Sequence, residues 1–425
     1  MFRLISSITA LLMATAILLL ANGLLGTLLA VRMSVEAFST GATGAIMAFY
    51  YLGLLLGAIW ASIAVTRVGH ARAFAVFAAL VTAATLTHGL FVSGWLWAVL
   101  RLLTGFSMAG IYVVIESWLN ERGQGGNRGR LFSFYQIASY LGLGAGQLLL
   151  TISPIEGTEL FMIAGTLFAL CLIPIAATRT IQPAPLARSS IPLRAVLRAS
   201  PIGSSVCLAA GIVSGSLLSL APIFVTAHAS IGRVATFMAA LILGGMLLQY
   251  PIGHLSDRFD RQRLIIAVSS LLAATTVVAW WVAELPFPSL SLTALALGGL
   301  TFTLYPLGVA QITDRVRGQS FVAITSVVLL IWGVGAASGP VLVGQLMVVT
   351  GVDGLLLAIG GIAALLALTT LVLRADPLPP SEQSGFCSMT ATTPVLAGLD
   401  PRTEPDDPQL DWVDEVSART STANQ

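Results

Sequence analysis

Long apolar segments follow one another along most of the chain, and short polar segments separate them. A membrane-spanning helix needs about 20 predominantly apolar residues. Twelve segments meet that length, and they cover residues 8–31, 42–66, 73–93, 95–119, 130–152, 159–177, 202–227, 234–254, 263–283, 289–312, 320–349 and 353–373. The pattern predicts an all-α membrane protein with twelve transmembrane helices.

The first apolar segment has two interpretations. Arg3 followed by apolar residues would suit a secretory signal peptide. The apolar stretch runs over residues 8–31, however, and the apolar core of a signal peptide has about 7–15 residues. We therefore expect an uncleaved helix. The third and fourth segments are divided only by residues 92–94, which makes their boundary the shortest in the chain.

Composition supports the membrane assignment. The chain has 425 residues, of which 56% are hydrophobic and 9% charged, and its mean hydropathy is +0.90. Soluble domains carry about 25% charged residues. These values exclude a soluble globular enzyme, a coiled coil and a disordered chain. The 21 basic residues are all Arg and form no concentrated basic face, which excludes a nucleic-acid-binding protein.

The distribution of Arg predicts the orientation in the membrane. With the N-terminus inside, the cytoplasmic segments hold 16 Arg and the opposite side holds only Arg32 and Arg233. Cytoplasmic loops of membrane proteins carry an excess of basic residues. We therefore expect a multi-pass membrane protein with both termini in the cytoplasm.

The longest internal loop and the tail set the expected domain boundaries. Residues 1–177 would form one six-helix half, residues 178–200 a cytoplasmic linker, and residues 201–374 a second six-helix half. Residues 375–425 hold nine acidic residues and two Arg and are rich in Pro, Ser and Thr. That composition predicts a disordered cytoplasmic tail, which would serve solubility or bind a partner.

The two halves share a repeat. Residues 111–122 match residues 304–315 at an offset of 193, and both segments run from a Tyr through eight residues to an acid and an Arg. Residues 67–72 match residues 258–263 at an offset of 191. A parallel duplication of six helices is a recurring transporter architecture, in which substrate binds near the midplane between the halves.

The segment from Gly253 to Arg263 carries a recognisable motif, with Asp257, Arg258 and Arg261 between them. Its pattern, G-x-L-x-D-R-x-x-R-x-R, resembles the loop between the eighth and ninth helices of the major facilitator superfamily. A second resemblance, to the YcaD-type branch of bacterial facilitators, rests on the segment from Glu116 to Asn120 and on residues 128–130, Tyr135 and Gln147 after it. It implies a bacterial inner membrane as the location. The resemblance implies the major facilitator fold of two six-helix pseudo-repeats. It also implies a secondary transporter that moves a small organic solute by alternating access, coupled to protons, without a cofactor and as a monomer.

The resemblance implies that this loop is a cytoplasmic gate, which stabilises one state of the transport cycle. The alternative is a basic anchor of the membrane surface. A carboxylate at the C-terminal end of a helix is disfavoured by the helix dipole, so Asp257 should have an Arg or a helix N-terminus as partner. The first-half loop departs from the pattern, because Ser62 and Thr66 replace the Gly and the Asp. The candidate gating residues are Gly253, Asp257, Arg258, Arg261, Arg263, Arg67 and Arg72.

Arg101 lies inside the fourth segment, about 10 Å from its outer end at 1.5 Å per residue. An Arg at the centre of a span costs about 2.5–3.5 kcal/mol, so some interaction must offset that cost. With Gly105 and Gly110 it resembles the fourth-helix motif of proton-linked facilitators, in which the Arg influences proton coupling or meets an anionic substrate. The alternative is an Arg that extends to the outer interface beside Trp95 and Trp97.

Glu116 is the one acid inside a span away from the extreme ends, which makes it the best candidate for carrying a proton. The alternative is an ion pair with Arg122 or Arg130 at the inner surface. Other polar and aromatic residues within the spans are typical either of helix–helix hydrogen bonds or of a substrate cavity. With Arg101 and Glu116, the candidate substrate and proton residues are Asn22, Tyr112, Tyr140, Gln136, Gln147, Tyr305 and Trp332.

Three function classes remain. The leading one is a proton-coupled transporter for a small organic solute, which the single Arg suggests is anionic or aromatic. A proton-driven multidrug exporter and a transporter-like sensor without turnover are the alternatives. The chain has no Lys and therefore no P-loop, and its scattered His and Cys predict neither a metal site nor a catalytic centre.

Overall fold

The computed structural model contains fourteen α-helices and one short 3-10 helix among the residues that it describes. These are residues 2–123, 128–177, 191–283, 285, 288–316, 321–373, 383, 385 and 386. The helices are α1 (Phe2–Val35), α2 (Thr40–Val68), α3 (His70–Leu90), α4 (Gly94–Gly123), α5 (Arg128–Leu148), η1 (Leu149–Thr151), α6 (Glu159–Leu170), α7 (Leu172–Ala176), α8 (Leu193–Ala199), α9 (Pro201–His228), α10 (Ile231–Ser256), α11 (Arg261–Val282), α12 (Ser289–Arg315), α13 (Phe321–Thr350) and α14 (Gly354–Val372).

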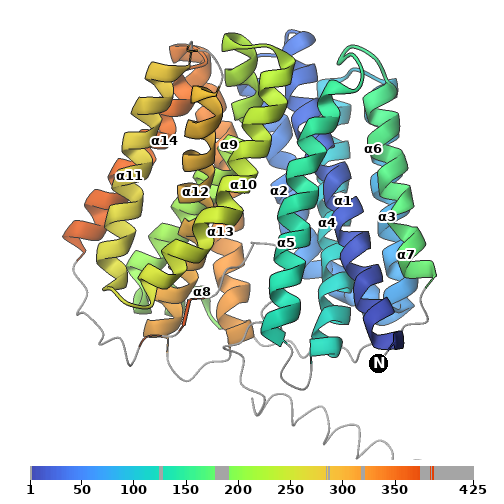
Figure 1. Cartoon of the computed structure of the whole chain (residues 1–425), viewed down its shortest axis with the longest axis horizontal. Helices are drawn as coiled ribbons and strands as arrows, with labels where there is room; N and C mark the ends of the chain where they lie inside the picture. The colour runs from blue at the N-terminus through green and yellow to red at the C-terminus, as the bar shows by residue number, and fades with distance from the viewer. Residues whose placement is uncertain are drawn as a thin grey trace, which may run out of the picture.

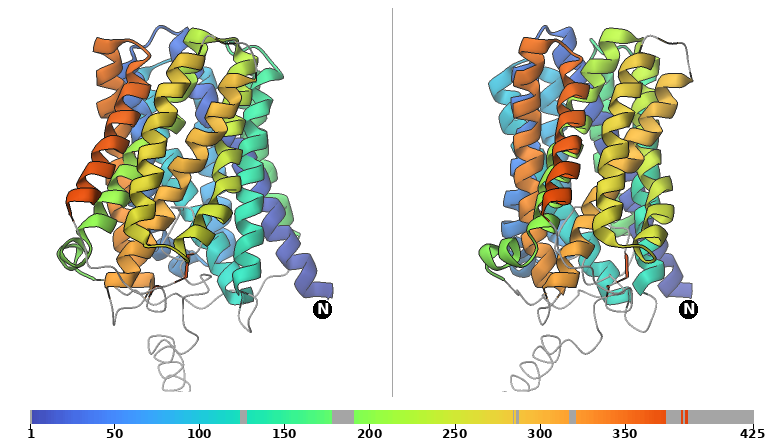
Figure 2. Two further views of the ribbon diagram at one scale, coloured as in Figure 1. Left: turned by 60° about the vertical axis from the view of Figure 1, so that its left-hand side comes forward. Right: turned by 90° about the vertical axis from the view of Figure 1, so that its left-hand side faces the viewer.

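The long helices run up and down between the same two ends of one bundle (Figures 1 and 2). We call the end where α1 begins the basal end, which is the bottom of Figure 1, and the opposite end the apical end. Helices α1 to α7 lie on one side of the bundle and α9 to α14 on the other. The sixth predicted span is made of two pieces, because α6 ends at Leu170 and α7 begins at Leu172.

Eleven helical stretches of the described chain are long and apolar enough to cross a membrane. The fifth predicted span is the one that does not reach this threshold, because its helix α5 has 21 residues but a less apolar sequence, with Arg128, Arg130, Gln136 and Gln147 among them. It packs against α1 and α10, and its opposite face, with Phe134, Ile137 and Leu141, is exposed. The all-α membrane class is therefore confirmed, and α5, which packs between helices of the two sides, is consistent with twelve spans in total.

The expected linker, residues 178–200, is helical at its end. Residues 178–190 lie outside the described part of the chain, but α8 occupies Leu193–Ala199 at the basal end. The expected disorder of residues 375–425 likewise falls outside the described residues, except at 383, 385 and 386.

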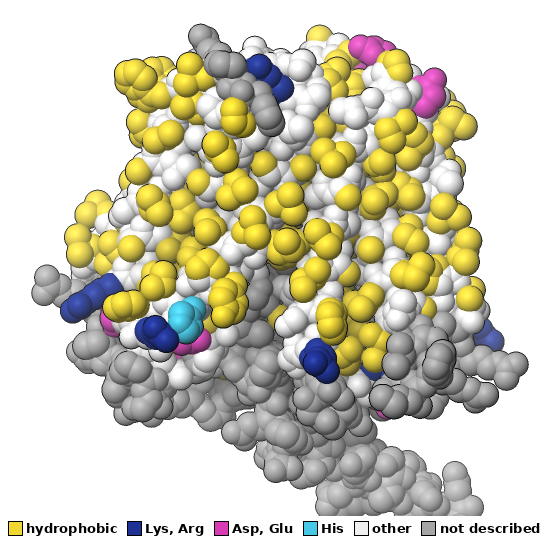
Figure 3. Space-filling model, in the orientation of Figure 1, with side chains coloured by type: hydrophobic (Ala, Val, Ile, Leu, Met, Phe, Trp, Pro, Cys, Tyr) yellow, Lys and Arg dark blue, Asp and Glu magenta, His cyan; other side chains and the backbone are white. Residues whose placement is uncertain are grey.

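The surface has the pattern of a membrane protein. A broad apolar belt covers the face seen in Figure 3, and basic side chains gather mainly along its lower edge. Large apolar side chains point outward, such as Leu90 at 70% and Trp281 at 72% exposure. Because lipid tails are as apolar as these side chains, such residues are stable on the outside of a bundle in a bilayer.

Helix α2 packs closely against α4 and α13, and glycines make both contacts possible. A methyl group at Gly105 of α4 would overlap the Tyr50 carbonyl oxygen of α2. A methyl group at Gly44 of α2 would overlap the Pro340 carbonyl oxygen of α13. Near the second contact, the Thr40 hydroxyl donates to the Gly344 carbonyl oxygen at 3.1 Å. The apical ends of the two sides are therefore in contact, and α2 fixes the side chains that it turns toward the centre.

We expect Gly105→Ala to lower the thermal stability of the protein. The added methyl group would force α2 and α4 apart, and overpacking of this kind costs about 1–3 kcal/mol. The matched control is Gly361→Ala on the exposed face of α14, where a methyl group would have no neighbour within 4 Å. There we expect a neutral or slightly stabilising effect, because Ala is the better helix former. Thermal unfolding in detergent measures both, and equal melting temperatures for the two variants would contradict the account.

Candidate functional site

A cavity of about 200 Å³ lies at the centre of the bundle. Helices of both sides form it, namely α1, α2, α4 and α5 and, opposite, α9, α10, α12 and α13. Its wall is largely aromatic, with neutral hydroxyl and amide groups between the rings and one cation. The polar and aromatic side chains that line it are Asn22, Thr27, Tyr50, Tyr51, Arg101, Tyr112, Tyr135, Ser139, Tyr140, Gln147, Ser214, Ser219, Thr301, Phe302, Tyr305 and Trp332.

Arg101 is the charged residue of this wall. It is 4% exposed, and its guanidinium carbon lies 4.4 Å from the centre of the Tyr50 ring. Its Nε has no hydrogen-bond partner, and no carboxylate of the described chain forms an ion pair with it. The side chain therefore points inward to the cavity rather than outward to the apical interface. A cation over an aromatic face gains stabilisation, but the Nε–H group of the guanidinium remains without a hydrogen-bond acceptor.

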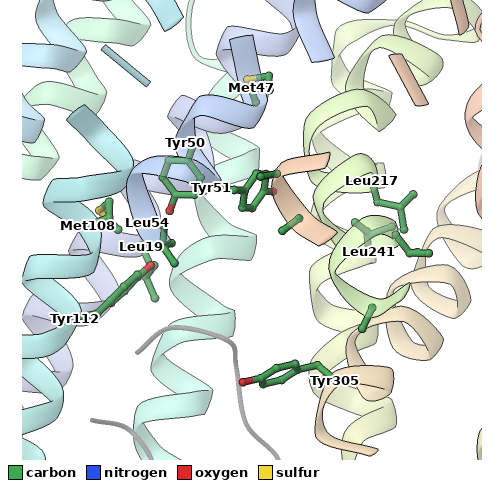
Figure 4. Packing of buried hydrophobic residues seen from close by; sticks show 14 of the residues in the cluster. Leu19, Met47, Tyr50, Tyr51, Leu54, Met108, Tyr112, Leu217, Leu241 and Tyr305 are labelled. Atoms are coloured by element: carbon green, nitrogen blue, oxygen red, sulfur yellow. The ribbon is translucent and has the colours of Figure 1, made fainter. Parts of the chain in front are cut away.

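Tyr50 links Arg101 to other predicted residues. Its side chain has Asn22 of α1 and Tyr112 of α4 as polar neighbours. Figure 4 shows the hydroxyl ends of Tyr50 and Tyr112 turned toward each other. The structure therefore brings Arg101, Asn22 and Tyr112 together around one tyrosine.

An aromatic group connects the two sides of the cavity. Tyr51 of α2 meets Trp332 of α13 edge-on with ring centres 6.1 Å apart, and Tyr305 of α12 meets the same Trp at 6.1 Å. The Tyr305 hydroxyl points from α12 toward the opposite side (Figure 4). Tyr305 and Tyr112 are the equivalent residues of the sequence repeat, and both line the cavity.

Glu116 lies behind the cavity wall rather than in it. The side chain is fully buried, and the Tyr135 hydroxyl donates to its Oε1 at 2.9 Å. Tyr135 itself lines the cavity. A buried carboxyl group is thus separated from the cavity by one hydroxyl group.

The three predicted residues of α5 have different surroundings. Gln147 is held between helices, because its Nε2 donates to the Gly23 carbonyl oxygen at 3.0 Å and its Oε1 accepts from Thr27. Tyr140 lines the cavity and accepts a hydrogen bond from Gln249 Nε2 of α10 at 2.6 Å. Gln136 is outside the cavity and borders a second hollow between the basal ends of α5 and α10.

Among the Arg residues of the predicted gating loop, Arg261 is the buried one. It forms an ion pair with Asp314 at the basal end of α12, and both side chains are 2% exposed. Its Nε also donates to the Ser256 hydroxyl at 3.1 Å. Arg263 has an exposed side chain, and its backbone N–H donates to Asp260, the N-cap of α11. Arg261 is therefore a buried structural group and not a surface anchor.

The expected partner of Asp257 was wrong. Its Oδ1 accepts a hydrogen bond from the backbone N–H of Phe386, at 2.7 Å, and no Arg of the described residues forms an ion pair with it. A methyl group at Gly253 would overlap the Phe386 ring. Arg258, Arg67 and Arg72 have exposed side chains at the basal end. The sequence offered no signal for the contact with Phe386, because it lies in the polar tail.

Several residues of the site were missed or undervalued. Tyr135 and Gln249 contact predicted residues, and Tyr50 and Tyr51 form the cavity wall beside Arg101. The pair Tyr50-Tyr51 within an apolar helix was the available signal. Among the described residues, no group of three or more His, Cys, Asp and Glu is placed to hold a metal ion.

Comparison with known protein families shows to which family of membrane proteins the chain belongs. The model of the Major Facilitator Superfamily matches residues 11–243 and 202–397, which together cover most of the chain. The chain belongs to the major facilitator superfamily.

Curated relatives of this facilitator support a narrower placement. It is 32% identical over 340 residues to an uncharacterized MFS-type transporter YcaD of Salmonella enteritidis, covering 78% of this chain and 86% of the relative. It is 31% identical over 356 residues to the YcaD protein of Salmonella paratyphi A, covering 82% and 90%. The expected resemblance to the YcaD branch is confirmed.

Solved structures agree on the fold. A mutant of the nucleoside transporter NupG superposes with a TM-score of 0.73 at 13% identity, covering 87% of this facilitator and 100% of NupG. A bacterial homolog of the human lysosomal transporter Spinster, in an inward-facing and unoccupied conformation, gives 0.65 at 13% identity, covering 93% and 97%. At this identity the likeness shows the fold alone.

The ion pair between Arg261 and Asp314 predicts a specific pattern of stability changes. Asp314→Leu should destabilise the facilitator by about 3–5 kcal/mol, because it leaves a buried guanidinium without its carboxylate. The double variant Arg261→Met with Asp314→Leu should recover most of that loss. Arg263→Met is the control, since its side chain is exposed. Thermal unfolding in detergent measures the cycle, and additive losses in the double variant would refute the buried pair.

Proposed function

We propose that this facilitator is a proton-coupled secondary transporter for a small organic anion with a planar, largely apolar body. The observation that carries the proposal is Arg101, a buried cation that faces the central cavity and has no carboxylate partner in the described chain. A carboxylate forms charge-assisted, often bidentate hydrogen bonds with a guanidinium group. An anionic solute would therefore supply the charge that the protein does not.

The rest of the wall favours a planar solute. Rings of Tyr50, Tyr51, Tyr305 and Trp332 face the cavity together with small hydroxyl groups, and no acidic side chain is among its lining residues. Ligand sites of this kind are mostly apolar and aromatic, with a few polar groups that fix orientation. A cationic drug would find no carboxylate in this wall and would meet the charge of Arg101, which favours the anion over the multidrug alternative.

Glu116 is the proposed proton carrier. It is buried, and the Tyr135 hydroxyl connects it to the cavity. Ionisable groups within transmembrane helices are expensive and are found where protons or substrates pass. Because the chain has no Lys for a P-loop, ion coupling is the proposed source of energy.

The basal end is proposed to face the cytoplasm of a bacterial cell, since most of the Arg residues that the structure describes lie there. Both termini would then be cytoplasmic. Residues 1–177 and 201–374 would rock as two halves about the cavity, with residues 178–200 as the linker between them. The apical contact of α2 with α13 suits an inward-open state of that cycle.

Flux into liposomes tests the anion proposal. We expect the wild-type protein to transport an aromatic carboxylate. Arg101→Gln should lower the transport rate at least tenfold, because the variant lacks the cation that pairs with the carboxylate. Arg194→Gln, on the exposed face of α8, is the control and should transport normally. Transport of cationic drugs instead, with no dependence on Arg101, would support a multidrug exporter. Carboxylate binding without flux would support a sensor.

A pH-sensitive dye inside the same liposomes tests the coupling. Glu116→Gln should abolish the solute-driven pH change while exchange of labelled for unlabelled solute continues, since exchange needs no net proton movement. Glu156→Gln at the exposed apical surface is the matched control. A normal pH change in Glu116→Gln would remove Glu116 from the coupling mechanism.

A further inference from the structure

A short part of the tail lies against the gating loop. Phe386 follows the end of α14 by 14 residues, and its backbone N–H donates to Asp257 Oδ1 at 2.7 Å. Asp257 is the C-cap of α10, where a carboxylate needs a donor to offset the helix dipole. The tail supplies that donor.

The Phe386 ring borders the hollow between the two sides of the bundle. It contacts Gly253 so closely that a methyl group there would overlap the ring. It lines the hollow at the basal ends of α5 and α10, together with Phe132 and Ser133 of α5 and Met246 of α10. The ring is half-buried and packs against the apolar core. The contact is therefore made by both the backbone and the side chain of one residue.

This hollow adjoins the central cavity. Tyr140 lines both, and its hydrogen bond from Gln249 crosses from α10 to α5 between them. Phe386 thus lies at the basal side of the cavity, on the path along which α5 and α10 would approach each other. Closed apical ends and a ring between the basal ends describe one state of an alternating-access cycle.

Charge and tethering favour the docked tail. Residues 375–425 carry nine acids and two Arg, whereas the basal end carries exposed Arg67, Arg72 and Arg258. Seven of the nine acids lie at positions 400–415, so opposite charges attract the tail as a whole to this surface, whereas Phe386 itself is held by its backbone N–H and its ring. A short tether raises the effective concentration of a bound segment to the millimolar range. A weak contact is therefore sufficient for substantial occupancy.

We propose that the tail segment at Phe386 is an intramolecular brake. It occupies the hollow between α5 and α10, donates a hydrogen bond to the carboxylate of Asp257 and keeps the basal ends of the two helices apart. The facilitator therefore returns to its outward-open state more slowly. The inference rests on the proposed alternating-access function, but its site is distinct from the cavity around Arg101.

The first test locates the segment in full-length protein in lipid nanodiscs. The photoreactive residue p-benzoylphenylalanine at position 386 keeps an aromatic ring and should cross-link to peptides of α5 and α10, identified by mass spectrometry. Gly253→Ala should lower the yield at least fivefold, because its methyl group displaces the ring. Gly361→Ala is the matched control and should leave the yield unchanged. Absence of these cross-links, or no effect of Gly253→Ala, would overturn the docking.

The second test measures the brake without any solute. A single cysteine, Thr40→Cys, is placed at the apical contact in a background with Cys171, Cys207 and Cys387 replaced by Ala. Phe386→Ala should raise its labelling rate by a membrane-impermeant maleimide at least threefold, because the apical end opens more often. Gly385→Ala is the adjacent control, since a methyl group there would meet no atom within 4 Å.

A double variant makes the second test specific. Gly253→Ala alone should raise the labelling rate as Phe386→Ala does. The double variant should be labelled no faster than either single variant. Equal rates for Phe386→Ala and Gly385→Ala, or additive effects of Gly253→Ala and Phe386→Ala, would overturn the brake. Neither readout uses Arg101, so a failure of the brake would leave the anion proposal intact, and a failure of anion binding would leave the brake testable.

Discussion

The centre of this molecule is built around one buried guanidinium group. It lies between helices, and no carboxylate of the described chain forms an ion pair with it. Removing a charge from water is expensive unless a partner compensates for it. Here the compensation is partial, since the Tyr50 ring lies against the cation at 4.4 Å. The close packing of α2 on α4 through Gly105 holds that ring in place.

The same constraint organises the cavity around it. Asn22 and Tyr112 surround the Tyr50 side chain, and an edge-on group of Tyr51, Trp332 and Tyr305 joins the two sides of the bundle. A solute that bridges Arg101 and this aromatic group would contact both sides at once. Its binding would then depend on their relative position, which is the physical requirement for coupling occupancy to a conformational cycle.

The sequence predicted the elements of the fold because each span must satisfy its own backbone hydrogen bonds in lipid and must therefore be a long apolar helix. Arg101 and the equivalent pair Tyr112 and Tyr305 were also predictable, the first from its cost in a membrane and the pair from the repeat. The contacts between helices were not predictable from the sequence. Glu116 with Tyr135, Tyr140 with Gln249 and Asp257 with Phe386 join residues whose meeting depends on how helices rotate and pack, and a single sequence does not encode that in a local pattern.

Thermal unfolding of Arg101→Met, with and without an aromatic carboxylate such as phenylacetate, tests the central claim most directly. If Arg101 is a buried cation that is compensated only when an anion binds, the ligand-free variant should melt at a higher temperature than the ligand-free wild-type protein. The carboxylate should then stabilise the wild type by about 2.7 kcal/mol at 100 times its Kd and leave the variant unchanged. A variant that melts lower without ligand, and that gains as much from the carboxylate as the wild type does, would contradict the account.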